Sequence, residues 1–293
     1  MNHQSPFFIL ANPRSGSSLL RIICDCNSKL TVPPESGFLL WWKSKYENIS
    51  TKDLRDPIQI EKLVTDILSS KKIETWQLEK EQLIQYLIYH NPVSYAHVGS
   101  LVYYFQALMR KKKPIVWGDK NNYYIHHLYD LIELYPDAKY IHLVRDGRDV
   151  ACSYRNLTSI VSTSDYFPNL PVDISEIAKE WADNNRRIEL FLKTNAKNNF
   201  LLVKYEDLVR SMKDTCIKIS EFLNVPFDKT MLEYNVLNKK NNLEPSQTVD
   251  WKMNTLKKPD TSRIHQYKLQ FSAEELDLFN LHAGSALKNY GYV

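Results

Sequence analysis

The sequence predicts an α/β fold in which a parallel sheet is covered by helices on both faces. Short, continuously apolar runs such as residues 7–11 (FFILA) indicate strands buried on both sides, because a strand with one face in water would alternate apolar and polar residues. Stretches with helical spacing separate these runs, and strands that alternate with helices are typical of parallel sheets. Residues 1–293 contain no composition shift that marks a linker, so we expect a single domain.

The expected elements follow one another without internal repeats. The first strand, at residues 7–11, leads through a short loop into a helix at residues 18–26. Residues 38–113 then have helical spacing and are rich in aromatic side chains. The later expected elements are a strand at 115–117, a helix at 123–135, a strand at 140–144, helices at 148–155 and 174–194, a strand at 200–203, a helix at 206–223 and a C-terminal helix that opens with the capping-box pattern of Ser272 and Glu275.

Composition narrows the classes of protein. A net charge of +4 is too mild for the basic face of a nucleic-acid-binding protein, although it suits an anionic ligand. Four cysteines in a chain of this length do not form a disulfide scaffold. The sequence has neither a recognisable secretion signal nor an apolar run long enough for a membrane span, so we expect a cytoplasmic protein.

The loop after the first strand has the features of an anion site. It has the sequence NPRSGSSLL over residues 12–20, with Gly16 just before the expected helix. Backbone N–H groups and the helix dipole converge at such a position. The loop departs from a nucleoside-triphosphate phosphate loop, because Ser17 stands where a lysine is required and the cation, Arg14, precedes the glycine. A serine-rich helix cap is the alternative interpretation.

A second group of cations follows the strand expected at residues 140–144. Arg145, Arg148 and Arg155 lie at the strand end and along the next helix, where guanidinium groups can bind a phosphate through two hydrogen bonds. An ion-pair network with the neighbouring aspartates is the alternative interpretation. Because the carboxyl ends of parallel strands meet at one edge of a sheet, two anion sites there predict a ligand with two separated phosphates.

These segments resemble the motifs of sulfotransferases that use 3′-phosphoadenosine 5′-phosphosulfate (PAPS). Residues 12–20 are similar to the family's 5′-phosphosulfate loop, and residues 143–153 (LVRDGRDVACS) to its 3′-phosphate motif. The segments at 204–208 (KYEDL) and 289–292 (NYGY) also resemble family segments. The resemblance implies a P-loop-like fold, with the poorly matching residues 38–113 on the acceptor side.

The resemblance further implies a PAPS site that releases the bisphosphate PAP and requires no metal. Backbone amides of residues 15–18 and the hydroxyls of Ser17 and Ser18 are expected at the 5′-phosphate, and Arg145 with Ser153 at the 3′-phosphate. The implied cofactor-binding residues are Arg14, Ser15, Gly16, Ser17, Ser18, Leu19, Arg145, Ser153, Tyr205 and Arg263.

A C-terminal segment covers the cofactor in the family. Four cations of this region could contact the cofactor from that segment, namely Lys252, Lys257, Lys258 and Arg263. Spacing does not distinguish among them, and we select Arg263. Residues 238–259 are polar, and we expect them to be mobile until the cofactor binds.

The resemblance also points to a glutamate as the catalytic base. Arginine rather than lysine in the first loop is closer to the tyrosylprotein and bacterial branches than to the animal cytosolic branch. Asn122 stands where the cytosolic branch has its histidine, two residues after Lys120, whereas the glutamate of the tyrosylprotein branch falls on Glu35. Glu35 is therefore expected to act as general base, and Lys120 with Arg14 to neutralise the charge that develops during transfer.

Each of these assignments has an ordinary structural alternative. Glu35 could be an exposed loop carboxylate. His126 and His127 lie inside an expected helix, and we interpret them as packing or surface residues. Trp41 and Trp42 follow Glu35 closely and are expected, with Glu35, to bind the acceptor, although most of the aromatic residues should form core.

The expected reaction is transfer of a sulfuryl group from PAPS to a hydroxyl or amine of a small molecule or a glycan. A P-loop kinase-like phosphotransferase and a non-catalytic nucleotide-binding module are the rival classes. The sequence identifies neither the acceptor nor the oligomeric state.

Overall fold

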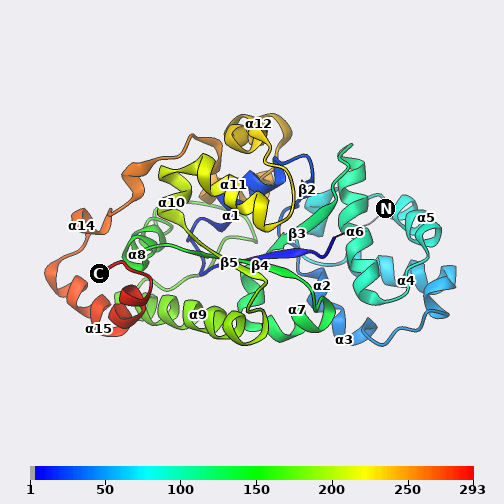
Figure 1. The fold of residues 1–293 in the computed structure, drawn as a ribbon, viewed down its shortest axis with the longest axis horizontal. Coiled ribbons are helices and arrows are strands. Elements are labelled where there is room, and N and C mark those ends of the chain that lie inside the picture. Colours follow the sequence, from blue (N-terminus) through cyan, green and yellow to red (C-terminus); the bar gives the residue numbers. More distant parts are fainter. Residues whose placement is uncertain (1–3) are drawn as a thin grey trace.

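A computed structural model describes residues 4–293 and contains a five-stranded, wholly parallel sheet (Figure 1). The strand order is β2-β3-β1-β4-β5. The first strand therefore lies in the middle of the sheet, and the chain passes from β3 on one side of β1 to β4 on its other side. The strands are β1 (Phe7–Leu10), β2 (Leu30–Thr31), β3 (Val116–Lys120), β4 (Lys139–Val144) and β5 (Phe200–Lys204). The predicted fold class is confirmed. The two-residue β2 was missed, because two residues carry no periodic signal.

Helices surround the sheet and extend beyond one edge of it. The α-helices of the first half are α1 (Ser17–Asp25), α2 (Phe38–Trp41), α3 (Lys43–Tyr46), α4 (Pro57–Leu68), α5 (Lys80–His90), α6 (Tyr95–Met109) and α7 (Leu128–Leu134). Those of the second half are α8 (Gly147–Arg155), α9 (Ile174–Asn195), α10 (Tyr205–Arg210), α11 (Met212–Phe222), α12 (Tyr234–Asn241), α13 (Ser246–Val249), α14 (Tyr267–Gln270) and α15 (Ala273–Asn289). Short 3₁₀ segments are η1 (Asp53–Arg55), η2 (Ile73–Trp76), η3 (Asn122–His126), η4 (Lys229–Glu233), η5 (Asp250–Leu256) and η6 (Thr261–Arg263).

The first strand is apolar throughout because both of its faces are covered. Phe7 and Ile9 belong to a cluster of buried residues that includes side chains of α1 and α11. Phe8 and Leu10 point the other way, into a cluster that includes side chains of α6 and α9. In Figure 1, α1 and α11 lie above the sheet and α9 lies below it. The alternation of side chains along a strand thus explains why a solvent-faced pattern is absent.

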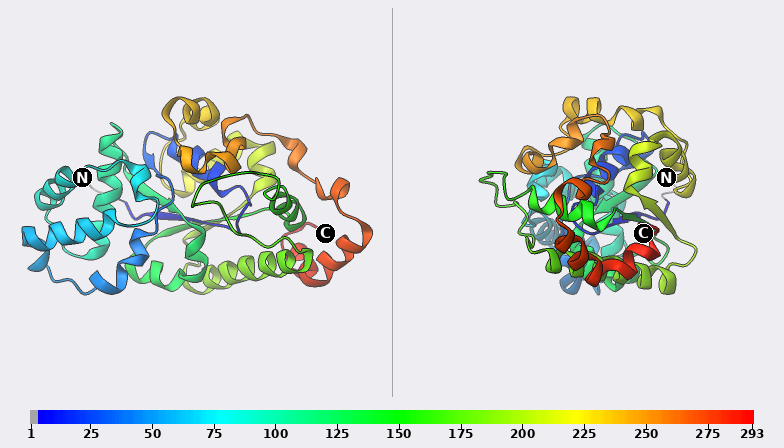
Figure 2. Two further views of the ribbon diagram at one scale, coloured as in Figure 1. Left: turned by 180° about the vertical axis from the view of Figure 1, so that it is seen from behind. Right: turned by 90° about the vertical axis from the view of Figure 1, so that its left-hand side faces the viewer.

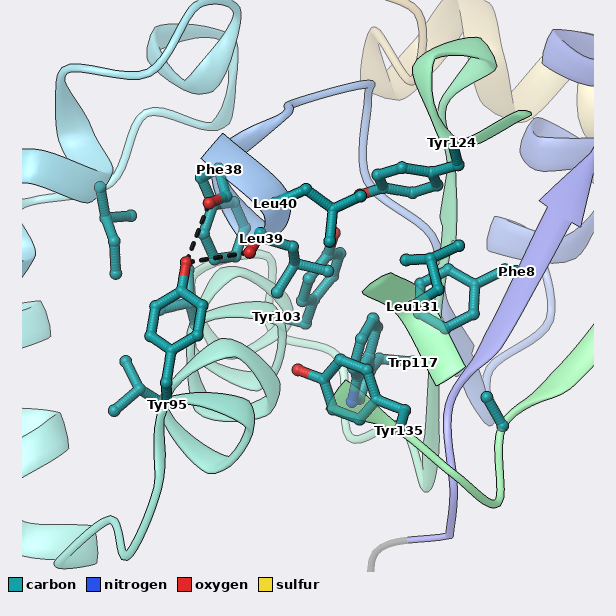
Figure 3. Close-up of a cluster of buried hydrophobic side chains, with 14 of the residues drawn as sticks. Phe8, Phe38, Leu39, Leu40, Tyr95, Tyr103, Trp117, Tyr124, Leu131 and Tyr135 are labelled. Carbon is teal, nitrogen blue, oxygen red and sulfur yellow. Dashed lines mark hydrogen bonds between the residues drawn. The ribbon is translucent and has the colours of Figure 1, made fainter. Parts of the chain in front are cut away.

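The aromatic stretch at residues 38–113 forms a helical lobe, as predicted. Its rings pack against the sheet: Tyr103 stacks on Trp117 of β3, with ring centroids 4.1 Å apart. The Tyr95 hydroxyl donates hydrogen bonds to the carbonyls of Phe38 and Leu39, which ties α6 to α2 (Figure 3). Most of these aromatic side chains are therefore core.

Two predicted helices are interrupted. The helix expected at 123–135 is the 3₁₀ segment η3 followed by α7, and the break falls at His127, whose φ of −133° is not helical. The helix expected at 206–223 is divided into α10 and α11 at Ser211, with φ −130°. In both cases the apolar pattern continues across the break, so spacing alone could not reveal it.

The segment at residues 238–259, expected to be polar, is held by specific hydrogen bonds. The Asn238 amide donates to the Thr255 hydroxyl at 3.1 Å, and the amide oxygen of Asn238 accepts from the Glu244 backbone N–H at 2.8 Å. The loop at 156–173 lies beside this segment (Figure 2), where Ser164 donates to the Gln247 carbonyl and the rings of Phe167 and Trp251 are 5.3 Å apart. Mobility of the segment before cofactor binding stays a prediction.

Within residues 4–293, none of the helices combines the length and the apolar character needed to cross a membrane.

Candidate active site

A cavity of about 440 Å³ lies at the carboxyl end of the sheet. The loop after β1, the end of β3 and the loop after β4 line it, together with Tyr205 after β5 and the segment at residues 251–263. Ligands of open α/β sheets bind at this edge, because the loops that follow the strands converge there. The structure therefore brings together the two predicted anion sites and the predicted catalytic residues.

The loop after β1 is shaped by two residues with left-handed backbone. Arg14 has φ +64° and Gly16 has φ +96°. A Cβ on Gly16 would lie 2.5 Å from the Tyr205 ring, so only glycine fits beneath that ring. Gly16 is also the N-cap of α1 and has no side chain to cap it. The interpretation of this loop as a serine-capped helix start is therefore wrong, and the first N–H groups of α1 are available to an anion.

Two of the three serines in the loop line the cavity, and the third is buried in the protein interior. Ser17 and Ser18 line the cavity, with Leu19 beside them. Ser15 is fully buried, and its hydroxyl finds no hydrogen-bond partner among the described residues. Ser15 is not among the described residues that line the cavity, and its backbone N–H donates to the Asn12 carbonyl at 3.3 Å, so the predicted contact of Ser15 with the 5′-phosphate stays a prediction.

Arg145 is held in place by main-chain carbonyls and an aromatic ring. Its Nη2 donates to the Arg263 carbonyl at 2.9 Å, and its guanidinium lies 4.5 Å from the centre of the Tyr205 ring. Its Nε is buried and finds no hydrogen-bond partner among the described residues. This N–H is therefore left unsatisfied in the ligand-free protein, which is uncommon for a buried polar group.

The ion pairs around Arg145 and Arg148 show which of these arginines fits a structural ion-pair network and which remains a candidate for binding phosphate. Arg148 pairs with Asp146 at 2.7 Å, which is the structural ion pair considered as an alternative. Asp149 accepts hydrogen bonds from the backbone N–H groups of His265 and Tyr267. The ion-pair interpretation therefore holds for Arg148, whereas Arg145 forms no ion pair within residues 4–293.

Arg14 lies between the two predicted anion sites. Its Nε donates to the Ser153 hydroxyl at 3.2 Å, and its Nη2 donates to the Trp251 carbonyl at 2.9 Å. Burial lowers the pKa of Arg14 to about 10, with further lowering by the charges of Arg145 and Arg263. The guanidinium groups of Arg14, Arg145 and Arg263 thus lie close enough to repel one another, and this concentration of positive charge suits a bound polyanion.

Glu35 and Lys120 meet at the wall of the same cavity. Lys120 ends β3 and is almost fully buried, and its ammonium donates to Oε1 of Glu35. The ammonium of Lys72 lies 3.0 Å from Oε2 of the same carboxylate. Burial would raise the pKa of Glu35, but the charges of Lys120, Lys252 and Lys72 outweigh it and hold the pKa well below its ordinary range.

Lys252 is anchored from behind by a buried carboxylate. Its ammonium donates to Oε1 of Glu244 at 2.6 Å, while Arg21 of α1 donates to Oε2 at 2.8 Å. Burial, together with the charge of Lys252, lowers the pKa of Lys120 despite its contact with Glu35. A chain of charges therefore runs from α1 through the segment at residues 244–252 to the pair of Glu35 and Lys120.

The remaining candidate residues lie elsewhere. Trp42 donates from Nε1 to the Ser70 hydroxyl at 2.9 Å and packs on the aromatic core. Trp41 is 39% exposed and contacts the Tyr123 ring. His126 is exposed and His127 pairs with Asp130. None of these four side chains is among the described residues that line the cavity, so an acceptor role for either tryptophan stays a prediction.

Sequence reasoning missed Lys72, Tyr166 and Glu244. Lys72 and Tyr166 line the cavity from segments that carry no motif. Glu244 reaches Arg21 across 223 positions of sequence. Only the left-handed backbone of Lys72, with φ +67°, distinguishes it locally, and no sequence pattern predicts that conformation for a lysine.

A parallel sheet with a glycine-containing anion loop between its first strand and first helix defines a nucleotide-binding protein of the P-loop-like class. Sequence comparison identifies the family within this class. A profile of the sulfotransferase family matches residues 6–229, most of the chain. The chain belongs to the sulfotransferase family, which confirms the family predicted from its motifs.

Similar proteins agree with this assignment. The chain is 24% identical over 241 residues to protein-tyrosine sulfotransferase A of Caenorhabditis elegans, covering 80% of this chain and 54% of that protein. The chain thus spans about half the length of that curated relative. Among solved structures, the sulfotransferase domain of the Synechococcus PCC 7002 olefin synthase matches with a TM-score of 0.59 at 23% identity, covering 96% of this chain and 95% of that one. Mouse sulfotransferase SULT7A1, solved in complex with PAP, matches with a TM-score of 0.51 at 15% identity, covering 98% and 89%. These structures share the fold.

Proposed function

We propose that this protein transfers the sulfuryl group of PAPS to a hydroxyl or amine of an acceptor, with Glu35 as the general base. The observation that carries the proposal is the contact between Glu35 and Lys120 at the wall of a cavity that also contains both anion sites. A carboxylate beside a buried ammonium can accept a proton on one side while positive charge is supplied on the other. A simple nucleotide-binding module has no need of this pair.

The cavity fits a nucleotide with two separated phosphate groups. Arg145 has a buried Nε without a partner among the described residues, and it lies beside Ser153 and Arg263 at one anion site. The backbone around Gly16 and the start of α1 form the other. Arg14 lies between them. We therefore place the 3′-phosphate at Arg145 and Ser153, and the 5′-phosphosulfate at residues 14–19.

Each residue of the site has a separate role in the proposed sulfuryl transfer. PAPS, when bound, supplies a sulfuryl group on a phosphate leaving group. Glu35 removes the proton from the acceptor hydroxyl as its oxygen attacks sulfur. Lys120 and Arg14 neutralise the charge that builds up on the oxygen between sulfur and phosphorus. The serine hydroxyls and amides of the loop orient the leaving phosphate.

A small molecule or a glycan is our first candidate acceptor. The cavity is lined on the acceptor side by polar residues such as Asn121 and Asn122 and by Tyr166, which can hydrogen-bond a hydroxylated ligand. A protein tyrosine is the second candidate, favoured by the similarity to the nematode protein-tyrosine sulfotransferase.

A thermal-shift comparison tests the cofactor and separates the rival classes. PAP at 100 times its dissociation constant should stabilise the protein by about 2.7 kcal/mol, and ADP should stabilise it much less. Equal shifts with PAP and ADP would contradict the proposal, and stabilisation only by ATP with magnesium would favour a kinase-like enzyme. Incubation with ³⁵S-labelled PAPS and a panel of hydroxyl and amine acceptors, read by mass spectrometry, then identifies the acceptor.

A further inference from the structure

Both oxygens of the Glu35 carboxylate are occupied by lysines in the ligand-free protein. Lys120 contacts Oε1 from the nucleotide side, and Lys72 contacts Oε2 at 3.0 Å. A general base must present one oxygen to the proton that it removes. Because Lys120 is needed beside the leaving group, the acceptor has to approach the oxygen that Lys72 holds.

Lys72 is positioned by a local structure that is specific to it. It precedes η2 with φ +67°, a conformation that costs a non-glycine residue energy and persists only where surrounding contacts impose it. Trp76 of η2 donates from Nε1 to the Pro34 carbonyl, which fixes η2 against the loop that carries Glu35. Lys72 is thus aimed at Glu35 from the acceptor side of the cavity.

The ammonium of Lys72 also has a second partner close by. It lies 5.5 Å from the centre of the Tyr166 ring, a geometry that stabilises a cation. The Tyr166 hydroxyl donates to Glu74 of η2 at 2.5 Å, so the ring is held next to the lysine. The Lys72 side chain is 27% exposed, which leaves it room to move off Glu35 toward this ring.

We propose that Lys72 is a positioning residue that covers the acceptor-facing oxygen of Glu35 and so prevents the enzyme from transferring its sulfuryl group to water before an acceptor arrives. The inference rests on the proposed function. An incoming acceptor hydroxyl takes the place of the Lys72 ammonium, which shifts toward Tyr166, and Glu35 then becomes available as a base.

The reaction that Lys72 prevents is simple hydrolysis. A water molecule at Oε2 would give a proton to Glu35 while its oxygen forms a bond to sulfur. The bond between sulfur and the bridging oxygen of PAPS would break, releasing PAP and sulfate, and Glu35 would return its proton to solvent. No oxidant, reductant or further reactant is needed.

Acceptor-independent release of PAP from PAPS measures this directly and requires no knowledge of the acceptor. Lys72→Met should raise the rate by about tenfold, a fraction of the 10²–10⁴-fold that a positioned base contributes. Lys72→Arg, which keeps the charge, should stay near the wild-type rate. Lys80→Met is the matched control, because Lys80 pairs with Glu61 at the surface. A Lys72→Met rate equal to that of wild type would overturn the inference.

A second readout needs no turnover. Carboxyl ¹³C NMR of the ligand-free protein, with the Glu35 signal assigned by Glu35→Gln, should show a higher pKa for Glu35 in Lys72→Met than in wild type. Lys120 from β3 and Lys252 from η5 still face the carboxylate, and Asp119 and Glu244 lie behind them, so the pKa should rise without reaching its ordinary value. An unchanged pKa would also overturn the inference.

The double variant Lys72→Met/Glu35→Gln separates this inference from the proposed function. Its PAP release should fall back to the wild-type rate, because the uncovered oxygen no longer belongs to a base. If the double variant stays fast, Lys72 does not act through Glu35 and the inference fails. If PAP does not stabilise even the wild-type protein, the proposed function fails first.

Discussion

The Glu244 carboxylate accepts a hydrogen bond at 2.8 Å from the guanidinium of Arg21, a residue 223 positions away, and both side chains are buried. The same carboxylate binds Lys252 at 2.6 Å through its other oxygen. Arg21 belongs to α1, the helix that begins at the phosphate loop, whereas Lys252 belongs to the segment that closes the cavity. Glu244 therefore couples the closing segment to the helix that presents the first anion site.

Replacement of Glu244 should destabilise the protein strongly. Glu244→Ala leaves Arg21 and Lys252 buried or half-buried without their counter-ion, and loss of one partner of a buried pair typically costs about 3–5 kcal/mol. Urea unfolding measures the difference. Glu61→Ala is the matched control, since Glu61 pairs with Lys80 at the surface and should cost no more than about 1 kcal/mol. Similar losses in both variants would show that the buried pair contributes little.

The same carboxylate should make stability depend on acid pH. Burial would raise its pKa, but the charges of Lys252 and Arg21 lower the pKa of Glu244 from 4.5 to about 2. A carboxyl whose pKa falls on folding stabilises the native state above the unfolded pKa, and this contribution disappears as pH falls through the folded pKa. Unfolding free energy should therefore decline between pH about 4.5 and 2, by roughly 3 kcal/mol from this group. Glu244→Gln should show a shallower decline over that range, and an identical slope would contradict the assignment.

Arg145 should carry the recognition of the 3′-phosphate. Arg145→Ala removes a guanidinium that lines the cavity at the proposed 3′-phosphate site, so PAP affinity should drop by about 1.5–3 kcal/mol, the scale of a charged hydrogen bond. Affinity for ADP, which lacks that phosphate, should change much less. Calorimetry with both nucleotides gives the two values. Arg155→Ala, which breaks a half-exposed pair with Glu275, is the control, and equal losses for PAP and ADP would place the 3′-phosphate elsewhere.

The fold could be predicted from the sequence because its signals are local. Continuous apolar runs marked β1, β3, β4 and β5, and the glycine and serines after β1 marked the start of α1. What escaped prediction depends on geometry that spacing does not encode. The breaks at His127 and Ser211 interrupt the backbone without interrupting the apolar pattern, and β2 is a two-residue strand recognisable by its pairing with β3.

The candidate site was predictable where it follows a strand and not where it arrives from a distant segment. Arg14, Lys120 and Arg145 each follow or end a strand, and parallel strands bring them to one edge. Lys72, Tyr166 and Lys252 come from segments whose placement is set by packing, such as the hydrogen bond from Trp76 to Pro34. The tryptophans beside Glu35 were proposed as acceptor residues on proximity in sequence, yet Trp42, in the turn between α2 and α3, packs against the core and donates to Ser70.

Glu35→Gln tests the base most directly. The amide keeps the size of the side chain but cannot accept a proton at neutral pH, so turnover on the true acceptor should fall by roughly 10²–10⁴-fold. PAP affinity should change little, because Glu35 lies at the wall of the cavity with Lys120 rather than at either anion site. Glu61→Gln at the surface and His126→Gln should retain activity. The pH dependence adds a signature: lysine charges hold the pKa of Glu35 well below its ordinary range, so the wild-type rate should persist below the pH at which an ordinary glutamate becomes protonated. Glu35→Gln should lack that acid limb. If it instead keeps most of the wild-type activity, the proton is taken by another group, and the assignment of Glu35 as base is wrong.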